Sequence, residues 1–299
     1  MTVTDLSTRA QGARLRHTVT LAGICSLLFL RLPVETGFGI LHKIPAWLLP
    51  SVEIAAYGLT AFLIWWERDR LSDFHLDPLA LGMVLLFKPI ETLYLGPFWR
   101  TRSILAFPRA PALAIWAIAA VLLLALLAGR HKSLRISRRL LLWLAIGAGA
   151  GLALAVLLGY PAFLQTVSGP LTDAMRRDIR RRLPLAAIPV RILTGIPYQL
   201  GYAAAYEEPI FRGFLWGYLR NLGWKHVWIL FLQAALFSFG HLYYLGRLPF
   251  SFWVIVPVGG LAFGLAAWRS RSIATSMVTH GVMNAATALM GSALAGHVF

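Results

Sequence analysis

The sequence predicts an all-α protein, a polytopic transmembrane helix bundle with about seven to nine membrane helices. Of its 299 residues, 58% are hydrophobic and only 13% are charged, and the mean hydropathy is +0.68. A soluble domain carries about twice that share of charged residues. Apolar runs of about 20 residues, the length that crosses a bilayer, recur along the chain. These observations together indicate an integral membrane protein.

The net charge of +16 comes largely from arginines in short clusters between the apolar runs. This is the usual pattern of loops that flank membrane helices. We therefore expect anionic lipid headgroups, and not nucleic acid, as the partner of this charge. The single cysteine, Cys25, excludes an internal disulfide and a Cys-based metal cluster. We expect it to be a small buried residue.

The N-terminal region begins with polar residues 1–17, followed by an apolar run at 19–30. No small-x-small cleavage site follows this run, so we predict an uncleaved first membrane helix and not a signal peptide. A second helix is predicted at 46–66, with two tryptophans at the membrane interface. His75 and Asp77 in the next connector could be a pair of metal ligands, but so short a motif in a loop favours a solvated loop.

Three more apolar runs follow, at 79–95, 110–128 and 140–159. Lys88 and Glu91 interrupt the first run at i,i+3 spacing, which we interpret as a structural ion pair that faces other helices. The second run is uninterrupted. The third contains glycines at every second position from 147 to 151, and small residues at such spacing predict a helix-packing face.

Residues 171–183 carry apolar side chains at every fourth position and arginines between them. This pattern predicts a basic amphipathic helix on the lipid surface, in preference to a patch that recruits substrate. We divide the chain after it into an N-terminal transmembrane region, 1–184, and a second transmembrane domain, 185–299. The arginine-rich loops at 130–139 and 176–182 flank a single span, so the positive-inside rule gives no orientation.

The last third contains apolar segments at about 185–206, 209–219, 226–245 and 252–295, the last of them broken at 268–272. Ionisable groups inside membrane helices are unfavourable and usually functional. Three polar sets lie in these segments: Glu207-Glu208-x-x-x-Arg212, Phe237-x-x-x-His241 and His280-x-x-x-Asn284. The spacing of each set places its members on one helix face. We interpret the second carboxylate and the arginine of the first set as an ion pair in the favoured order.

The side chains of these sets have complementary chemistry. Glu207 and His241 can share a water molecule and remove its proton, as general-base hydrolysis requires. His280 and Asn284 can donate hydrogen bonds to a developing oxyanion. A proton-coupled transporter with Glu207 and His241 as its relay is a further hypothesis, but it predicts inverted repeats, and the sequence contains none that we find.

Pro209 follows the two carboxylates directly. Inside a helix it removes one backbone hydrogen bond and produces a kink. At the start of a new helix it would instead place the carboxylates at a favourable N-terminal dipole. The sequence leaves both interpretations open.

The order E-E-x-x-x-R, F-x-x-x-H, H-x-x-x-N resembles the three-motif signature of the CPBP (CAAX protease and bacteriocin-processing) family of intramembrane endopeptidases, also called Abi or Rce1-like proteins. The resemblance covers about residues 190–290. It implies a CAAX prenyl protease 2-like enzyme in which Glu207 and His241 activate water, with possible assistance from Glu208. It further implies an oxyanion hole of His280 and Asn284, and structural support from Arg212 and Phe237.

Family members have been described both as metalloproteases and as glutamic-type proteases. Glu207, His241 and His280 could supply a zinc site with one open position. Because His280 as a ligand would leave the oxyanion short of a donor, we expect no metal and keep zinc as the alternative.

The resemblance implies a membrane protein or peptide as substrate. The arginine-rich composition and the Ala- and Leu-rich helices are typical of a prokaryotic gene, so we expect a multi-pass protein of a prokaryotic inner membrane. A non-proteolytic immunity or assembly factor of the same fold is the alternative function.

Overall fold

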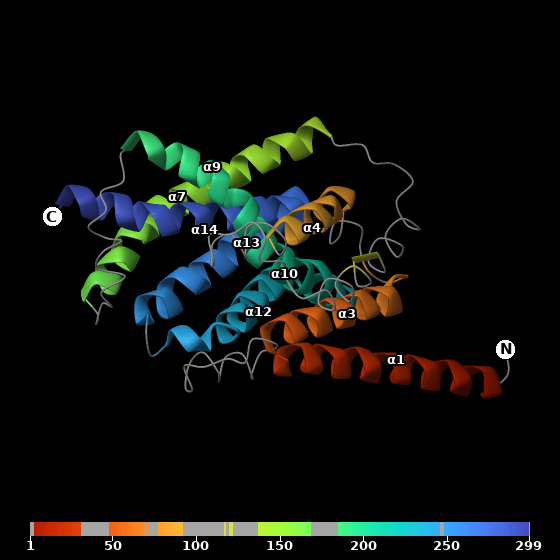
Figure 1. Cartoon of the computed structure of the whole chain (residues 1–299). Helices are drawn as coiled ribbons and strands as arrows, with labels where there is room; N and C mark the ends of the chain where they lie inside the picture. Colours follow the sequence, from red (N-terminus) through yellow and green to blue (C-terminus); the bar gives the residue numbers. More distant parts are fainter. Residues whose placement is uncertain are drawn as a thin grey trace.

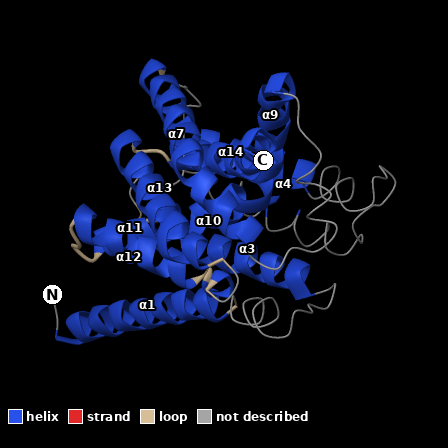
Figure 2. Ribbon diagram, turned by 90° about the vertical axis from the view of Figure 1, so that its left-hand side faces the viewer, coloured by secondary structure: helices blue, strands red, loops and turns tan. Residues whose placement is uncertain are grey.

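The computed structural model describes residues 3–30, 48–69, 71, 77–91, 117, 120–121, 137–168, 185–245 and 248–298. Its regular elements over these residues are helices, and none of them is a strand (Figure 2). The predicted all-α class is therefore confirmed. The helix predicted at 110–128 falls almost wholly outside these ranges, and the amphipathic helix at 171–183 falls entirely outside them.

Helix α1 (Val3–Phe29) lies along α3 (Leu48–Glu67) (Figure 1). One face of α1 makes this contact, and Gly23 on that face lies directly against Leu63. A polar link joins the two helices, because Arg16 and Thr20 of α1 both contact the buried carboxylate of Glu67.

Cys25 departs from the prediction. Its side chain is exposed and not buried. The physical reason is that α1 packs through Thr20, Gly23 and Leu27, and Cys25 lies off that face of the helix.

Helix α4 (Pro78–Ile90) begins at Asp77, whose carboxylate accepts a hydrogen bond from the backbone N–H of Ala80 at 3.0 Å. The other carboxylate oxygen accepts a hydrogen bond from the Ser272 hydroxyl at 2.5 Å. The prediction of a solvated loop is therefore wrong for Asp77, which is a helix cap that also binds a distant segment; His75 lies outside the described residues. The predicted pair of Lys88 and Glu91 is confirmed, with Nζ and Oε2 3.1 Å apart.

Helix α7 (Arg138–Ser168) and helix α14 (Ile273–Val298) make the most extensive helix–helix contact (Figure 1). Their close approach depends on glycines of α7. A Cβ atom at Gly147 would lie 2.8 Å from Thr279 Oγ1, and one at Gly151 would lie 2.5 Å from the carbonyl oxygen of the same residue. The predicted packing face is therefore present, and it uses every fourth residue.

The chain is helical without a break from residue 185 to residue 221, although the helix type changes five times. Two π-helical segments flank the short α-helix that carries the two glutamates. In chain order the segments are η3 (Leu185–Ala187), α9 (Ile188–Gln199), η4 (Leu200–Ala204), α10 (Ala205–Glu208), η5 (Pro209–Leu215) and α11 (Trp216–Asn221).

The remaining elements form the other wall of the bundle. Helix α12 packs against α13, where Gly260 lies against Ala234 and Gly264 against Gln233. The break predicted at 268–272 is present, since Arg271 adopts a left-handed conformation between α13 and α14. The elements are α12 (His226–Phe239), η6 (Leu242–Tyr244), η7 (Ser251–Ile255) and α13 (Val256–Ser270).

Within the described residues, two helical stretches are long and apolar enough to cross a membrane, Arg138–Leu164 and Ser251–Ser270. Shorter apolar helices lie at Ile54–Glu67, Pro78–Lys88 and His226–Phe239. The larger number of membrane helices expected from the apolar runs stays a prediction.

Candidate active site

The two adjacent glutamates lie on α10, the four-residue α-helix between η4 and η5. Pro209 is the first residue of η5, and because the helix continues through it, Pro209 does not begin a separate helix. The wider π-helical turns on both sides change which way side chains face, and such segments occur frequently at functional sites. Glu207 is 7% exposed and Glu208 is 0% exposed.

Glu208 links its own helical segment to α14 through its carboxylate. Its Oε1 lies 3.2 Å from Arg212 Nη1 and accepts a hydrogen bond from His280 Nδ1 at 2.9 Å. Its Oε2 accepts a hydrogen bond from the Ser276 hydroxyl. A buried carboxylate with a charge partner and several hydrogen bonds is fixed in place, so Glu208 holds α14 against the helix of the two glutamates.

Arg212 is also fully buried. Its Nη2 donates to the carbonyl oxygen of Gly260 at 3.1 Å. The guanidinium carbon lies 4.6 Å from the ring centroid of Phe237, and 5.5 Å from that of Phe263. Contacts of this kind between a cation and ring faces are favourable when both are desolvated, and they attach α13 to the same cluster.

Glu207 lies between two imidazoles. Its Oε1 is 3.8 Å from His241 Nε2, and its Oε2 is 3.8 Å from His280 Nε2. Both separations exceed a direct hydrogen bond. All three side chains line one cavity, so a water molecule in it can contact Glu207 together with His241.

His241 follows the C-terminal end of α12, and its ring is held in one orientation. Nδ1 lies 2.8 Å from the carbonyl oxygen of Phe237. Because a carbonyl only accepts hydrogen bonds, Nδ1 carries the proton, and the lone pair of the neutral ring is on Nε2, which faces Glu207. The Phe237 ring packs on the imidazole at a centroid distance of 4.7 Å. This arrangement suits His241 to take a proton through Nε2.

His280 and Asn284 lie one turn apart on α14. The His280 ring stacks on Phe263 at a centroid distance of 4.3 Å. Its Nδ1–H donates to Glu208, so Nε2 donates a hydrogen bond only when both ring nitrogens carry protons. Asn284 is half-buried and lines the same cavity.

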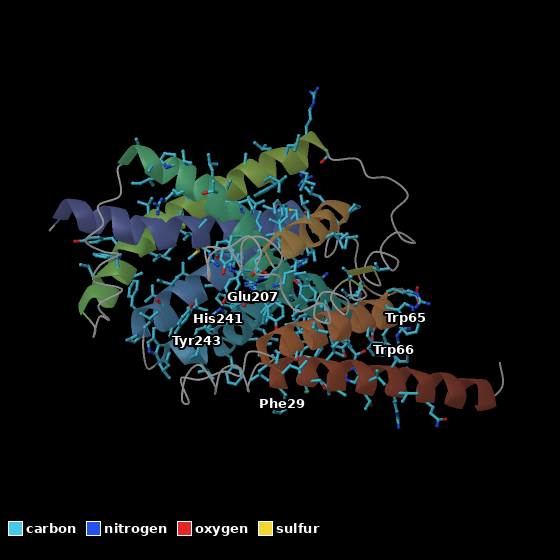
Figure 3. The ribbon with its side chains drawn as sticks, in the orientation of Figure 1. Phe29, Trp65, Trp66, Glu207, His241 and Tyr243 are labelled. Carbon is cyan, nitrogen blue, oxygen red and sulfur yellow. The ribbon has the colours of Figure 1, made fainter. Side chains whose placement is uncertain are left out.

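The cavity has a volume of about 670 Å³, within the range of ligand-binding pockets. Glu207, His241, His280 and Asn284 contribute polar groups to its wall, and most of its surface is aromatic or aliphatic. Figure 3 shows Glu207, His241 and Tyr243 near the centre of the bundle. The aromatic residues of the wall are Tyr202, Tyr206, Phe237, Tyr243, Tyr244 and Phe263.

The donor set Glu207, His241 and His280 has the chemistry of a zinc site. Both imidazoles direct Nε2 at the carboxylate while a carbonyl or carboxylate holds the other nitrogen, as in zinc-binding histidines. However, no group of three His, Cys, Asp or Glu side chains in the described ranges has the spacing of a metal site. We derive no step of the mechanism through a metal ion.

The structure brings together all seven residues selected from the sequence, namely Glu207, Glu208, Arg212, Phe237, His241, His280 and Asn284. The sequence did not point to two further residues of the site, Ser276 and Tyr243. Ser276 precedes His280 by one helical turn, so the periodicity of α14 could have indicated it. Tyr243 lies in a 3₁₀ turn after His241, where no periodic signal exists.

Residues 189–286 match the family model described as type II CAAX prenyl endopeptidase Rce1-like. This region is an Rce1-like domain. It extends over every site residue from Glu207 to Asn284, and it supports the CPBP assignment made from the three motifs. The family is membrane-embedded, in agreement with the apolar helices of the domain. The match covers about a third of the chain. A search of curated proteins and a search of solved structures found no match.

Proposed function

We propose that the protein is an intramembrane endopeptidase that hydrolyses a peptide bond of a membrane protein or peptide. The observation that carries this proposal is the position of Glu207, within 3.8 Å of the Nε2 atoms of both His241 and His280, on the wall of a cavity lined mainly by residues of the Rce1-like domain. A buried carboxylate beside two imidazoles can accept and return a proton, which hydrolysis requires.

The proposed reaction begins with a water molecule in contact with Glu207 and His241. One of these two groups takes a proton from the water while the oxygen attacks the carbonyl carbon of the peptide bond. The carbonyl oxygen becomes an oxyanion. The C–N bond then breaks, and the stored proton passes to the departing nitrogen, which leaves as an amine. The products are a carboxylic acid and an amine, so atoms and charge balance.

The oxyanion is stabilised by donors on α14. Asn284 offers the N–H₂ group of its amide, and His280 offers Nε2–H in its doubly protonated form. Glu208 and Arg212 hold His280 in place through the hydrogen bond to Nδ1. In this scheme Glu208 is a positioning residue and Glu207 reacts.

We further propose that the chain spans a prokaryotic inner membrane several times, with about seven to nine helices. The exposed apolar side chains of α7, among them Leu142 and Leu157, support contact with lipid along that helix. The arginine clusters of the loops would then contact anionic headgroups.

The decisive experiment measures cleavage by the purified full-length protein in detergent micelles. The substrates are a library of internally quenched apolar peptides and a farnesylated peptide with a CAAX terminus, and mass spectrometry identifies the cut. We expect the wild type to cleave at least one of them and Glu207→Ala to lose this activity. Undiminished cleavage by Glu207→Ala would sink the mechanism.

Two further outcomes separate the alternatives. Metal analysis of active wild-type protein, with a chelator control, distinguishes a zinc enzyme from the metal-free mechanism, since only the former contains stoichiometric zinc and is inhibited by the chelator. Wild-type protein that binds substrates without cleaving them would instead favour an immunity or assembly factor.

A further inference from the structure

Gln199 is a polar residue of the cavity wall to which the proposed mechanism gives no role. It is the last residue of α9, and it lines the same cavity as Glu207 and His280. Its side chain is partly buried. In the described part of the chain its carboxamide makes no hydrogen bond, so its N–H₂ group and its oxygen are available to a molecule that occupies the cavity.

The helix around Gln199 is held in one rotational orientation. The next residue, Leu200, is buried against α14, where a Cβ atom at Gly281 would lie 2.7 Å from Leu200 Cδ2. The residue after it, Gly201, lies directly against the backbone of Phe87 on α4. Because both neighbours are packed this tightly, the helix has no space to rotate, and Gln199 keeps its position on the cavity wall.

Gln199 shares its helix face with the reacting carboxylate. The residues of this continuous helix that line the cavity are Gln199, Tyr202, Ala203, Tyr206 and Glu207. Gln199 precedes Glu207 by eight residues, which is about 12 Å at the α-helical rise. An extended peptide covers about 3.3 Å per residue. A substrate that lies along this face therefore meets Gln199 about three or four residues from the bond beside Glu207.

The chemistry of the wall indicates which part of a substrate Gln199 would bind. Most of the wall is aromatic or aliphatic, which suits the apolar side chains of a membrane peptide, and such side chains form no hydrogen bonds. Each peptide group of the substrate, however, carries an N–H and a C=O that are costly to leave unpaired in an apolar cavity. A carboxamide both donates and accepts hydrogen bonds, so Gln199 can pair with either group.

We propose that Gln199 is a substrate-binding residue, whose carboxamide forms a hydrogen bond with a main-chain peptide group of the substrate about three or four residues from the bond that is cleaved. This inference rests on the proposed endopeptidase function. It means that the substrate lies extended along the helix that joins Gln199 to Glu207, and that its main chain is recognised there in preference to its side chains.

The test begins with Gln199→Met, which keeps the length of the side chain and removes its hydrogen-bonding groups. On the best-cleaved peptide of the library we expect KM to rise on the order of 10-fold, because a substrate peptide group is left unpaired. The value of kcat should change less than about threefold, since the contact is equal in the ground state and the transition state. Thr194→Val is the matched control, an exposed position of α9 whose hydroxyl bonds to its own helix, and it should behave as the wild type.

A series of modified substrates then locates the contact. Each peptide of the series has one main-chain N–H replaced by an ester oxygen, within about four residues of the cleaved bond on either side. With the wild type, an ester about three or four residues away on one side should raise KM on the order of 10-fold. With Gln199→Met the same ester should raise KM less than about twofold, because its partner is already gone. With Thr194→Val the full rise should remain.

A Gln199→Met enzyme with the KM of Thr194→Val overturns the inference and leaves the endopeptidase function standing. A raised KM together with an undiminished effect of every ester also overturns it, because Gln199 then acts through a substrate side chain or through packing. A wild-type protein that cleaves no peptide overturns both the function and the inference.

Discussion

Glu91, at the C-cap of α4, and Glu207 on α10 are nearly equally buried, at 6% and 7% exposure, yet their surroundings are different. Glu91 makes a direct ion pair with Lys88 at 3.1 Å. Glu207 has imidazole nitrogens at 3.8 Å on both sides and faces a cavity. Burial of a carboxylate therefore does not identify a reactive one. The two carboxylates differ instead in the kind of neighbour and in their access to a cavity.

The difference has a simple physical basis. A buried ammonium in direct contact with a carboxylate fixes both charges, and separating them leaves an uncompensated charge in an apolar medium. An imidazole titrates near neutral pH and can exchange a proton with its neighbour. The first arrangement stabilises a helix end, and the second permits proton transfer during a reaction.

The largest expected effect comes from neutralising the two carboxylates in turn. Glu207→Gln should lower kcat by about 10²–10⁴-fold, the contribution typical of a general base, and should not lower the thermal midpoint. Glu91→Gln should do the reverse, with a lower midpoint and unchanged kcat per folded molecule. Cleavage assays and thermal unfolding of both variants in one detergent check this, and equal effects at the two positions would remove the distinction.

A smaller effect is expected at the Lys88–Glu91 pair itself. Lys88→Met leaves the Glu91 charge buried and should reduce the free energy of unfolding by about 3 kcal/mol or more. The double variant with Glu91→Leu removes both charges and should recover most of that loss. Denaturant unfolding of the single and double variants measures the difference, and a double variant no more stable than Lys88→Met would contradict the ion-pair interpretation.

The smallest expected effect tests the packing that places α14 beside the site. Gly151→Ala puts a methyl group 2.5 Å from the Thr279 carbonyl oxygen and should reduce stability by about 1–3 kcal/mol through overpacking. Gly149→Ala is the matched control, because no atom lies within 4 Å of its added Cβ; it should be neutral or slightly stabilising. Equal unfolding midpoints for the two variants would argue against a tight α7–α14 contact.

Local spacing was sufficient to find seven residues of the candidate site, although it did not find Ser276 and Tyr243. Each of the three polar sets is read within one helical turn, and the pairs Lys88–Glu91 and Glu208–Arg212 lie within four residues. Such contacts are determined by helix geometry alone, which explains why the sequence predicts them.

The contacts that span the sequence were not predictable in this way. His280 binds Glu208 across 72 residues, and Ser272 binds Asp77 across 195. Neither has a local signature, since they depend on how helices pack. Cys25 was mispredicted for the same reason, because a sequence pattern does not tell which face of α1 meets α3. The sequence likewise does not predict that Glu207 has one imidazole on each side, because His241 and His280 come from different helices.

The hydrogen bond between Ser272 and Asp77 has a consequence for biosynthesis. During translation, Asp77 is synthesised 195 residues before its partner serine, so the Asp77 carboxylate lacks this hydrogen bond until Ser272 has been made. Helix α14, which begins at the next residue, supplies His280 and Asn284. The nascent chain therefore cannot assemble the complete candidate site before α14 has been synthesised.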